Sequence, residues 1–281
     1  MTYGTIVVCG GGCYGGYYVR QLARARAAGA LQARQILVVD RDPACRVAQL
    51  IAAISASDHV AIDAHTWRMQ RSDDASTPAS ESATYVGLPI AFVASEWVPF
   101  FAGWFGERIA APDRGAEDAV VPSPLMPHLL ADWVASRVHA ARPEDAVHRV
   151  PMTSTPDTPW ARDGADLARY VSFATWMCPI NCIEPPRCPE TRSARDWTMP
   201  AAVRNAVAAA AEKGTRYDVV ALFQTMHRAY GVGMFDVADA ADADAAIRAA
   251  PRDRPLRVLV ASVSHCHGAL AELLCEHTAR P

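Results

Sequence analysis

The sequence predicts an α/β fold with a mostly parallel sheet and helices on both faces. Three observations favour this class. Short apolar strands alternate with longer segments of helical pattern along most of the chain. A glycine-rich turn joins the first expected strand to the first expected helix. The composition, 51% hydrophobic and 20% charged over 281 residues, is typical of a globular chain with a core of its own.

The N-terminal region is predicted to run in the order strand, helix, strand, helix. The second strand leads directly to Asp40, and Asp42-Pro43 then predicts a helix start, with Asp42 as N-cap and Pro43 as the first helical residue. These elements are a strand over 5–9, a helix over about 14–28, a strand over 35–39 and a helix opened at 42–43.

The middle of the chain is predicted to hold shorter elements. A polar stretch, 71–83, is expected to be a loop, and the apolar stretch 86–106 is interrupted by Pro89, Pro99 and Gly103, which favours a buried strand and an aromatic turn over a membrane span. The expected elements are strands over 59–62 and 90–94, an aromatic turn over 97–105, a strand ending at 121 and a helix over about 125–140.

The second half is predicted to continue the same sheet after a long connection. That connection, 142–166, is rich in Pro, Asp and Thr and is the expected boundary between an N-terminal segment, residues 1–141, and a C-terminal segment, residues 142–281. The expected elements are a strand over 170–177, a helix over 200–214, a strand over 219–223, a helix over 239–250, a strand over 256–262 and a final helix.

The glycine turn is the first candidate site. Gly10-Gly11-Gly12-Cys13-Tyr14-Gly15 has the spacing G-x-G-x-x-G between an expected strand and an expected helix. In that spacing one glycine makes the tight turn, the next lets backbone amides approach a pyrophosphate, and the third lets the helix pack on the strand. Asp40 stands at the end of the second strand, where an acceptor for ribose hydroxyls belongs.

The first 60 residues resemble the NAD(P)-binding Rossmann superfamily, particularly its TrkA-N-like branch. The resemblance implies a Rossmann-like fold, Gly10, Gly12 and Gly15 around the pyrophosphate, and Asp40 on the adenosine ribose. It favours NAD as the cofactor, while the neighbouring Arg41 keeps NADP open. The bulky Tyr14 within the turn departs from the pattern. FAD or S-adenosylmethionine, or a turn that binds no ligand, are the alternatives.

The cysteine loop is the second candidate site. Cys178, Cys182 and Cys188 follow one another as C-x3-C-x5-C on a proline-rich segment. Thiolates at such spacing select zinc, Cu(I) or iron–sulfur clusters, and the Cys-Pro pairs favour the iron–sulfur option without excluding zinc. A buried thiol cluster or a redox pair is the alternative.

Further ligands and catalytic groups are expected at the same edge of the sheet. Cys266 and His267 follow the strand 256–262 and are candidate metal ligands, because ligands gather at the carboxyl ends of strands in open α/β sheets. Glu184, His227 and His265 are candidate catalytic residues, with Glu184 as a proton shuttle beside the metal. Helix-capping or surface histidines and a solvated carboxylate are the simpler interpretations.

The composition narrows the partners. A net charge of -3 and a pI near 6.3 argue against nucleic acid, which requires a basic face. No signal peptide or membrane segment is recognised, so a cytoplasmic protein is expected, and its eight cysteines are expected to be reduced. The partner is predicted to be a small molecule, and a homo-oligomer is left open.

These observations together predict an NAD(P)-dependent oxidoreductase with a cysteine-ligated metal. The glycine turn predicts the nucleotide, and the cysteine loop predicts the metal. Two alternatives remain at this point: a nucleotide-responsive binding protein that senses metal or redox state, and a non-redox metalloenzyme on a Rossmann-like scaffold.

Overall fold

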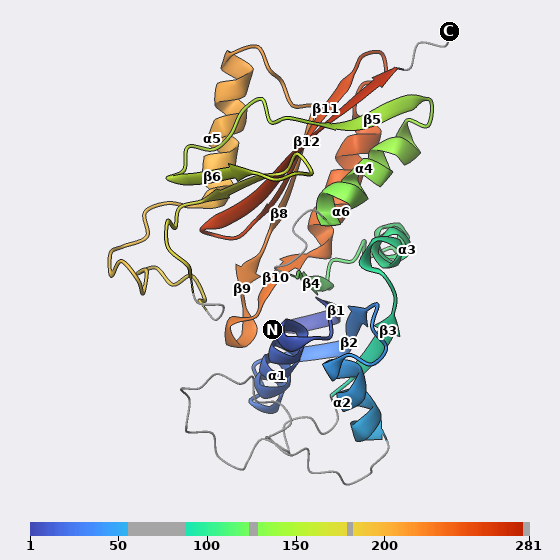
Figure 1. Cartoon of the computed structure of the whole chain (residues 1–281). Coiled ribbons are helices and arrows are strands. Elements are labelled where there is room, and N and C mark those ends of the chain that lie inside the picture. The colour runs from blue at the N-terminus through green and yellow to red at the C-terminus, as the bar shows by residue number, and fades with distance from the viewer. Residues whose placement is uncertain (56–87, 124–128, 179–181, 278–281) are drawn as a thin grey trace.

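The computed structural model describes residues 1–55, 88–123, 129–178 and 182–277 and has a mixed α/β fold. Its described strands form two sheets, one at each end of the molecule (Figure 1). The expected α/β class is confirmed. The expected strand 59–62 and loop 71–83 lie outside the described residues.

The first sheet contains the N-terminal strands in the order β3-β2-β1-β4-β10-β9. Its first four strands run parallel, and β10 is antiparallel to both β4 and β9. The strands are β1 (Thr2–Cys9), β2 (Gln32–Asp40), β3 (Ile90–Ala94), β4 (Ala119–Val121), β9 (Met226–His227) and β10 (Gly233–Asp236). The helices between them are α1 (Cys13–Ala27), α2 (Arg46–Ser55) and α3 (Trp97–Ala110).

Both faces of the first sheet are buried. Alternate residues of β1 belong to different cores: Ile6 and Val8 pack with residues of α1 and α2, whereas Val7 and Cys9 pack with Phe101 and Phe105 of α3. All four β1 residues are 3% exposed or less. This continuous apolar run is what a parallel strand covered on both sides requires.

The second sheet has the strand order β6-β7-β12-β11-β8, and β5 also pairs with β12. Only β11 and β8 pair in parallel among its described strands. The strands are β5 (Asp145–Val150), β6 (Trp160–Asp163), β7 (Arg169–Ser172), β8 (Val219–Gln224), β11 (Leu256–Val263) and β12 (His267–His277). The helices are α4 (Leu129–Ala141), α5 (Met199–Glu212) and α6 (Val237–Ala249).

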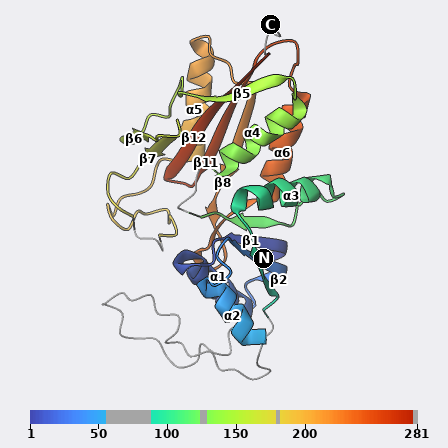
Figure 2. The same ribbon diagram turned by 45° about the vertical axis from the view of Figure 1, so that its right-hand side comes forward.

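Strand β11 shows how the second sheet is covered. Leu259, Ala261 and Val263 pack with residues of α5, and Val258 and Val260 pack with residues of α4 and α6. Figure 2 shows α5 behind this sheet and α4 and α6 in front of it. The core that contains Val258 and Val260 also contains β1 and α3 residues, so it joins the two sheets.

The expected continuation of one sheet through the second half is wrong, because the second half builds a sheet of its own. The expected connection 142–166 contains strands β5 and β6. The chain does return to the first sheet once: it leaves β8 at Gln224, and β9 and β10 then extend the first sheet beside β4. The two sheets therefore meet where residues 224–233 cross between them.

Two expected elements have the wrong type. The segment 97–105 is the first half of helix α3, because Pro99 stands in the first turn, where a missing N–H breaks no helical bond. The expected final helix after Gly268 is strand β12, which pairs with β11 from Leu256 to Val263. Its Ala- and Leu-rich composition suits a helix, but pairing across a tight turn overrides that local preference.

Some boundaries also differ from expectation. Asp42 and Pro43 form a turn ahead of α2, which begins at Arg46, and the Asp42 carboxylate accepts a hydrogen bond from the Ala44 N–H. Of the expected strand 170–177, only the part up to Ser172 is a strand, and it belongs to β7. No helix among the described residues is both long and apolar enough to cross a bilayer.

Candidate metal centre and adjoining cavity

Four cysteine side chains from two distant segments line one pocket. Cys178, Cys182 and Cys188 come from the cysteine loop, and Cys266 comes from the turn between β11 and β12, residues 264–266. The pocket has a volume of about 170 Å³. We call it the thiol pocket; all four cysteines are free thiols. The two segments that the sequence predicts to lie at one edge therefore line a common pocket.

Glu184 ties the cysteine loop to that turn. Its carboxylate accepts hydrogen bonds from the Ser264 hydroxyl at 2.7 Å, the His265 N–H at 2.9 Å and the Cys266 N–H at 3.0 Å. Its backbone has φ of 50°, a left-handed conformation that a non-glycine residue adopts at some cost. The loop is thus held in a strained conformation that places one carboxylate over three donors.

The carboxylate of Glu184 is kept ionised by these contacts. Burial alone would raise its pKa, but the three hydrogen bonds from the turn together lower it below the ordinary value. The Glu184 side chain is only 9% exposed. A fixed negative charge therefore lies at the wall of the thiol pocket.

The thiols differ in how readily they lose a proton. Burial raises the pKa of Cys178, with smaller contributions from Cys182 and Cys188, and burial raises the pKa of Cys266 to about 11. In contrast, the N–H of Thr191 lowers the pKa of Cys188. Without a bound cation, Cys266 is protonated at neutral pH, so ligation there would have to release its proton.

Two tryptophans and an arginine face these sulfur atoms. Trp176 lowers the pKa of Cys178 and Trp197 lowers that of Cys266, each acting against the larger effect of burial. Both indole Nε1 atoms are buried, and neither has a hydrogen-bond partner among the described residues. Arg195 lines the same pocket, where its charge favours the Cys188 and Cys266 thiolates. N–H donors and cations around sulfur are the usual surroundings of metal-bound thiolates.

His267 presents an unprotonated nitrogen. The Ser172 hydroxyl donates to the Ala174 carbonyl at 2.7 Å, so its oxygen can only accept from His267 Nδ1, 3.0 Å away. The proton of the neutral ring is thereby assigned to Nδ1, and Nε2 keeps its lone pair. Burial lowers the pKa of His267, which favours this neutral form.

His227 lies on the other side of Glu184. Its Nδ1 is 2.8 Å from the Gly231 carbonyl, which can only accept, and its Nε2 is 3.7 Å from Glu184 Oε2. A second proton on Nε2 would therefore face a carboxylate. The turn that carries Gly231 also packs on Ile183 of the cysteine loop, which fixes His227 relative to Glu184.

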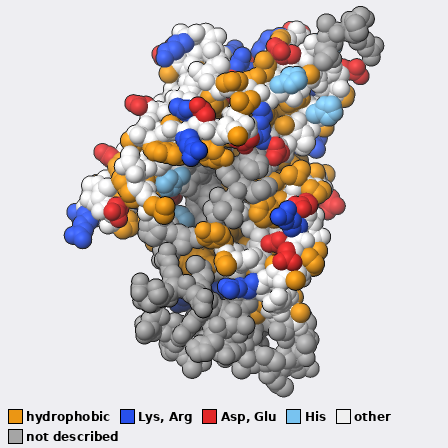
Figure 3. Space-filling view, viewed as in Figure 1, with side chains coloured by type: hydrophobic (Ala, Val, Ile, Leu, Met, Phe, Trp, Pro, Cys, Tyr) orange, Lys and Arg blue, Asp and Glu red, His pale blue; other side chains and the backbone are white. Residues whose placement is uncertain are grey.

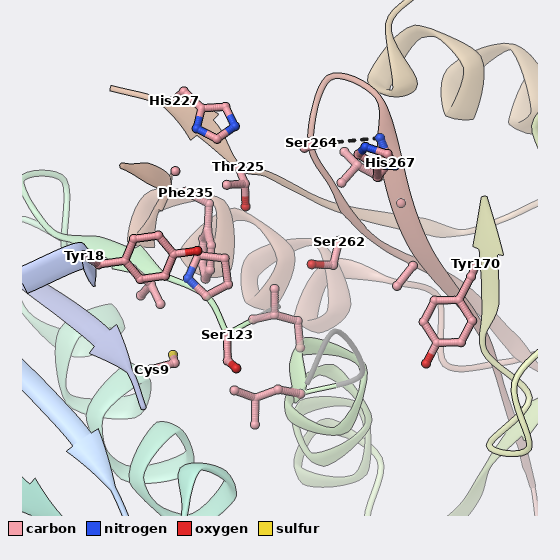
Figure 4. A pocket seen from close by; sticks show the side chains of 18 of the residues that line it. Cys9, Tyr18, Ser123, Tyr170, Thr225, His227, Phe235, Ser262, Ser264 and His267 are labelled. Carbon is pink, nitrogen blue, oxygen red and sulfur yellow. Dashed lines mark hydrogen bonds between the residues drawn. The ribbon is translucent and has the colours of Figure 1, made fainter. Parts of the chain in front are cut away.

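A larger cavity of about 440 Å³ adjoins the thiol pocket. His227, Ser264 and His267 line both spaces. Figure 4 shows His227, Thr225, Ser264 and His267 along one side of the cavity, with Cys9 and Ser123 across from them. In the space-filling view, hydrophobic and histidine side chains border the grey atoms in the middle of this face (Figure 3).

The cavity lies at a topological switch point of the first sheet. Strand β1 pairs with β2 on one side and with β4 on the other, and the cavity is lined by Cys9 at the end of β1 and by Pro122 and Ser123 just after β4. Crevices at such points, outside the carboxyl ends of parallel strands, are where open α/β sheets bind ligands.

The glycine turn has the backbone geometry that the sequence predicts. Gly10 has φ of 92°, and a Cβ on Gly15 would stand 1.8 Å from the Gly10 carbonyl oxygen, so neither position accepts a side chain. Gly12 precedes α1, has no side-chain cap and has no atom within 4 Å of a built Cβ. The N-terminal amides of α1 are thus open to an anion.

Asp40 stands next to this turn but already has backbone partners. Its Oδ2 accepts from the Gly11 N–H at 2.7 Å and its Oδ1 accepts from the Asp42 N–H at 2.9 Å. Each carboxylate oxygen has a second lone pair. The carboxylate is therefore oriented by the turn and keeps acceptor capacity for a hydroxyl group.

The structure brings most of the expected residues of the second half together. Glu184, His227 and His267 line the thiol pocket with the four cysteines, whereas His265 lines neither this pocket nor the larger cavity, and its buried Nε2 has no partner among the described residues. Within the described ranges, no group of three or more His, Cys, Asp or Glu side chains is arranged to hold a metal ion. The four cysteines line one pocket but form no such group.

A family model described as "Uncharacterized protein, C-terminal domain" matches residues 130–276, more than half of the chain. The chain belongs to this family. The family domain contains all four cysteines of the thiol pocket, Glu184, His227 and His267, and it excludes the glycine turn. Neither the curated proteins nor the solved structures provide a match to the chain.

Sequence reasoning missed several residues of this site. Ser172, which assigns the His267 proton, lies in a strand with no distinctive pattern, and Ser264 was only one member of the expected turn. Trp176 and Trp197 read as packing residues, although Trp176 stands two residues before Cys178. The sequence does not show that these two side chains lie beside the cysteines, because that depends on the fold.

Proposed function

We propose that the protein is an NAD(P)-dependent oxidoreductase that acts on a small molecule, with a thiolate-bound metal centre beside its active cavity. One observation carries the proposal: the cavity extends from the switch point of the first sheet to the thiol pocket, and His227, Ser264 and His267 belong to the walls of both. A nucleotide at the glycine turn and a substrate near the histidines would therefore share one space.

The nucleotide is supported by the turn and the strand order together. The open amides ahead of α1 suit a pyrophosphate, and the oriented Asp40 suits a ribose hydroxyl. When bound, NAD(P)H supplies a hydride. Cys9, which directly precedes the turn, lines the cavity, so the reacting end of a bound dinucleotide has a route into it.

His227 is the proposed proton donor of the reaction. Reduction of a carbonyl by a hydride leaves an alkoxide, which must take up a proton. His227 donates through Nδ1 to the Gly231 carbonyl, and its Nε2 stands 3.7 Å from Glu184 Oε2, so both ring nitrogens are oriented. Glu184, held by three donors, serves as a positioning residue and not as a proton shuttle.

An iron–sulfur cluster is the proposed centre, because the Cys-Pro pairs of the cysteine loop favour it, and a single zinc ion is the alternative. Either would be held by the four cysteines that line the thiol pocket. Four thiolates complete the ligand set of such a cluster. The centre would clamp the cysteine loop to the 264–266 turn and so fix Glu184.

Metal analysis of anaerobically purified protein tests the centre. We expect iron with acid-labile sulfide and a broad visible absorbance in the wild type, with both lost in Cys182→Ser. Cys13→Ser is the matched control, because Cys13 is an exposed thiol on α1. Zinc in place of iron would overturn the cluster and keep a metal; a wild type without either metal would overturn the metal centre.

Turnover tests the redox activity. We expect the holo-protein to consume NADH or NADPH with members of a panel of small aldehydes and ketones. We expect His227→Gln to lower kcat at least tenfold with a smaller change in KM, since the lost group acts on a developing alkoxide. Absence of turnover with every member would contradict the proposal.

A second candidate function is a nucleotide-binding sensor of metal or redox state. The observation in its favour is that four cysteines are enough to close the coordination of a metal centre and leave no position for a substrate. A sensor would bind NAD(P) and the metal without turnover, and metal loss would change its affinity for the nucleotide. The same NADH assay and a nucleotide titration of the apo- and holo-proteins separate the two functions.

A further inference from the structure

The larger cavity has a distinctive chemical lining. None of the described residues that line it is an arginine, lysine, aspartate or glutamate. Much of its wall is apolar and belongs to the core that joins the two sheets. Members of that wall are Phe101, Val120, Leu129, Leu130 and Phe235.

Four of the polar groups lie at one side. His227, Ser264, His267 and Thr225 lie along one edge in Figure 4, on the side that adjoins the thiol pocket, with Cys9 and Ser123 across from them. Two of these groups have defined protonation: His267 keeps a lone pair on Nε2, and Ser264 donates its hydroxyl proton to Glu184. The Thr225 hydroxyl can donate to a carbonyl oxygen, and His267 Nε2 can accept from a hydroxyl, so the polar side can orient one oxygen-bearing group of a ligand.

The charges near that side disfavour an anion. The Glu184 carboxylate stands behind Ser264, whose hydroxyl donates to it, and would repel a carboxylate or phosphate placed against the histidines. Arg195 lines the thiol pocket and donates to the Pro185 carbonyl. It does not line the cavity, so it is not a partner for an anion there. A buried anion without a partner cation or hydrogen-bond donors is disfavoured, because it loses its hydration without replacement.

A cationic ligand would not find a free carboxylate in the described lining of the cavity either. The Glu184 carboxylate already accepts three hydrogen bonds from the 264–266 turn, and the described lining of the cavity supplies no other acidic side chain. An ammonium group would lose its hydration without gaining a free carboxylate. The volume of about 440 Å³ is at the lower end of the range for small-molecule sites.

We infer that the cavity binds an uncharged, largely apolar ketone, aldehyde or alcohol, with its oxygen against Thr225, His227 and His267 and its hydrocarbon part against Phe101, Leu130 and Phe235. The inference rests on the proposed function only for the reaction that the ligand undergoes. The selectivity itself is a property of the cavity wall and is measured without turnover.

The test compares two ligands of matched length that differ in one charge. We choose 2-octanone and 7-oxooctanoate and measure their binding to the purified holo-protein by equilibrium dialysis, with and without NAD+. We expect 2-octanone to bind at least tenfold more tightly than 7-oxooctanoate, and 2-octanol to behave as 2-octanone does. Equal affinity for the two ketones, or tighter binding of the acid, overturns the inference. So does a lack of binding of all three compounds.

A variant tests whether the selectivity arises from the cavity wall. Tyr170 lines the cavity from β7 and is only partly buried, so an arginine there can be accommodated with its charge near the wall. We expect Tyr170→Arg to strengthen the binding of 7-oxooctanoate at least tenfold and to leave 2-octanone within threefold. Tyr170→Phe is the uncharged control. An unchanged preference in a folded Tyr170→Arg protein contradicts the inference.

The outcomes separate this inference from the proposed function. If the proposed function fails, the protein neither consumes NAD(P)H nor holds a metal centre, yet the preference for 2-octanone persists. If the inference fails, turnover occurs with charged substrates, or the neutral compounds do not bind. Each result is read from a different measurement.

Discussion

The glycine turn and the thiol pocket are built in opposite ways. The turn, from Gly10 to Gly15 with Asp40, joins neighbouring elements, and its geometry follows from backbone contacts such as the Gly15 approach to the Gly10 carbonyl. The thiol pocket joins segments about eighty residues apart, and its geometry follows from one side chain, Glu184, which bridges them. One site is held by steric fit and the other by a charge.

The difference predicts how each site fails. A site held by close backbone packing is sensitive to added volume and insensitive to pH. A site held by a buried carboxylate is sensitive to loss of that charge, because the donors it satisfies are then left without partners. A variant can therefore break the backbone packing of the turn or the carboxylate bridge of the thiol pocket separately.

The largest effect is expected at Glu184. Glu184→Ala removes the acceptor of three donors in the 264–266 turn, so we expect the free energy of unfolding to fall by about 3–5 kcal/mol. The four thiols should no longer hold a metal together, because the loop and the turn lose their direct connection. Urea unfolding and metal content of the anaerobically purified protein are the measurements.

The control for this change is a second glutamate of the same loop. Glu190 is exposed, so we expect Glu190→Ala to change the free energy of unfolding by less than about 0.5 kcal/mol and to keep the metal. A Glu184→Ala protein as stable as Glu190→Ala would show that the bridge between loop and turn does not hold the site.

The next effect is expected at the glycine turn. A methyl group on Gly15 meets the Gly10 carbonyl at 1.8 Å, whereas one on Gly12 meets nothing within 4 Å. We expect Gly15→Ala to cost about 2–3 kcal/mol and to abolish the thermal stabilisation by NAD. Gly12→Ala should cost less than about 1 kcal/mol. Thermal scans with and without NAD compare the two, and equal effects would argue against a sterically held turn.

The sequence predicts the turn well because its determinants are local. Gly10, Gly15 and Asp40 stand at fixed offsets from two apolar strands, and a pattern of that kind can be recognised before any long-range contact is known. The same locality explains why β1, β2, α5 and β11 were predicted within a few residues of their observed bounds.

The thiol pocket was only partly predictable. The spacing of Cys178, Cys182 and Cys188 is visible in the sequence, and strand order suggested that Cys266 would join them. The bridging role of Glu184 was not visible, because it depends on its left-handed backbone and on amides that belong to a tight turn. The strand after that turn was also hidden, since its residues have a helical composition and form β12 only by pairing with β11.

The pH dependence of stability sharpens the comparison. The pKa of Glu184 in the folded protein is lowered from its ordinary value of 4.5, so the unfolded chain binds its proton more readily. Its contribution to stability is therefore present above about pH 4.5 and is lost as the pH falls through the lower folded pKa. We expect the stability difference between wild type and Glu184→Gln, from urea unfolding, to shrink as the pH falls from 7 toward 3.

Other carboxylates with lowered pKa values, such as Asp145 and Asp218, are present in both proteins and cancel in this difference. Gly15→Ala provides the contrast, because its difference from wild type should stay constant over the same pH range. A Glu184→Gln difference that does not change with pH would mean that the carboxylate is not ionised in the folded protein.

The smallest effect is expected at Asp40, which tests nucleotide choice without disturbing the fold. Asp40→Asn keeps an oxygen for the Gly11 N–H but loses the charge that would hold ribose hydroxyls, so we expect NAD to bind about tenfold more weakly. NADP, whose ribose carries a phosphate, should lose less, because that phosphate no longer meets a carboxylate. Asp42→Asn is the control: the Asp42 carboxylate accepts from the Ala44 N–H in the same turn, and its replacement should leave both affinities unchanged. Titrations of NADH and NADPH fluorescence give two dissociation constants for each protein, and a ratio unaltered by Asp40→Asn would remove Asp40 from the nucleotide site.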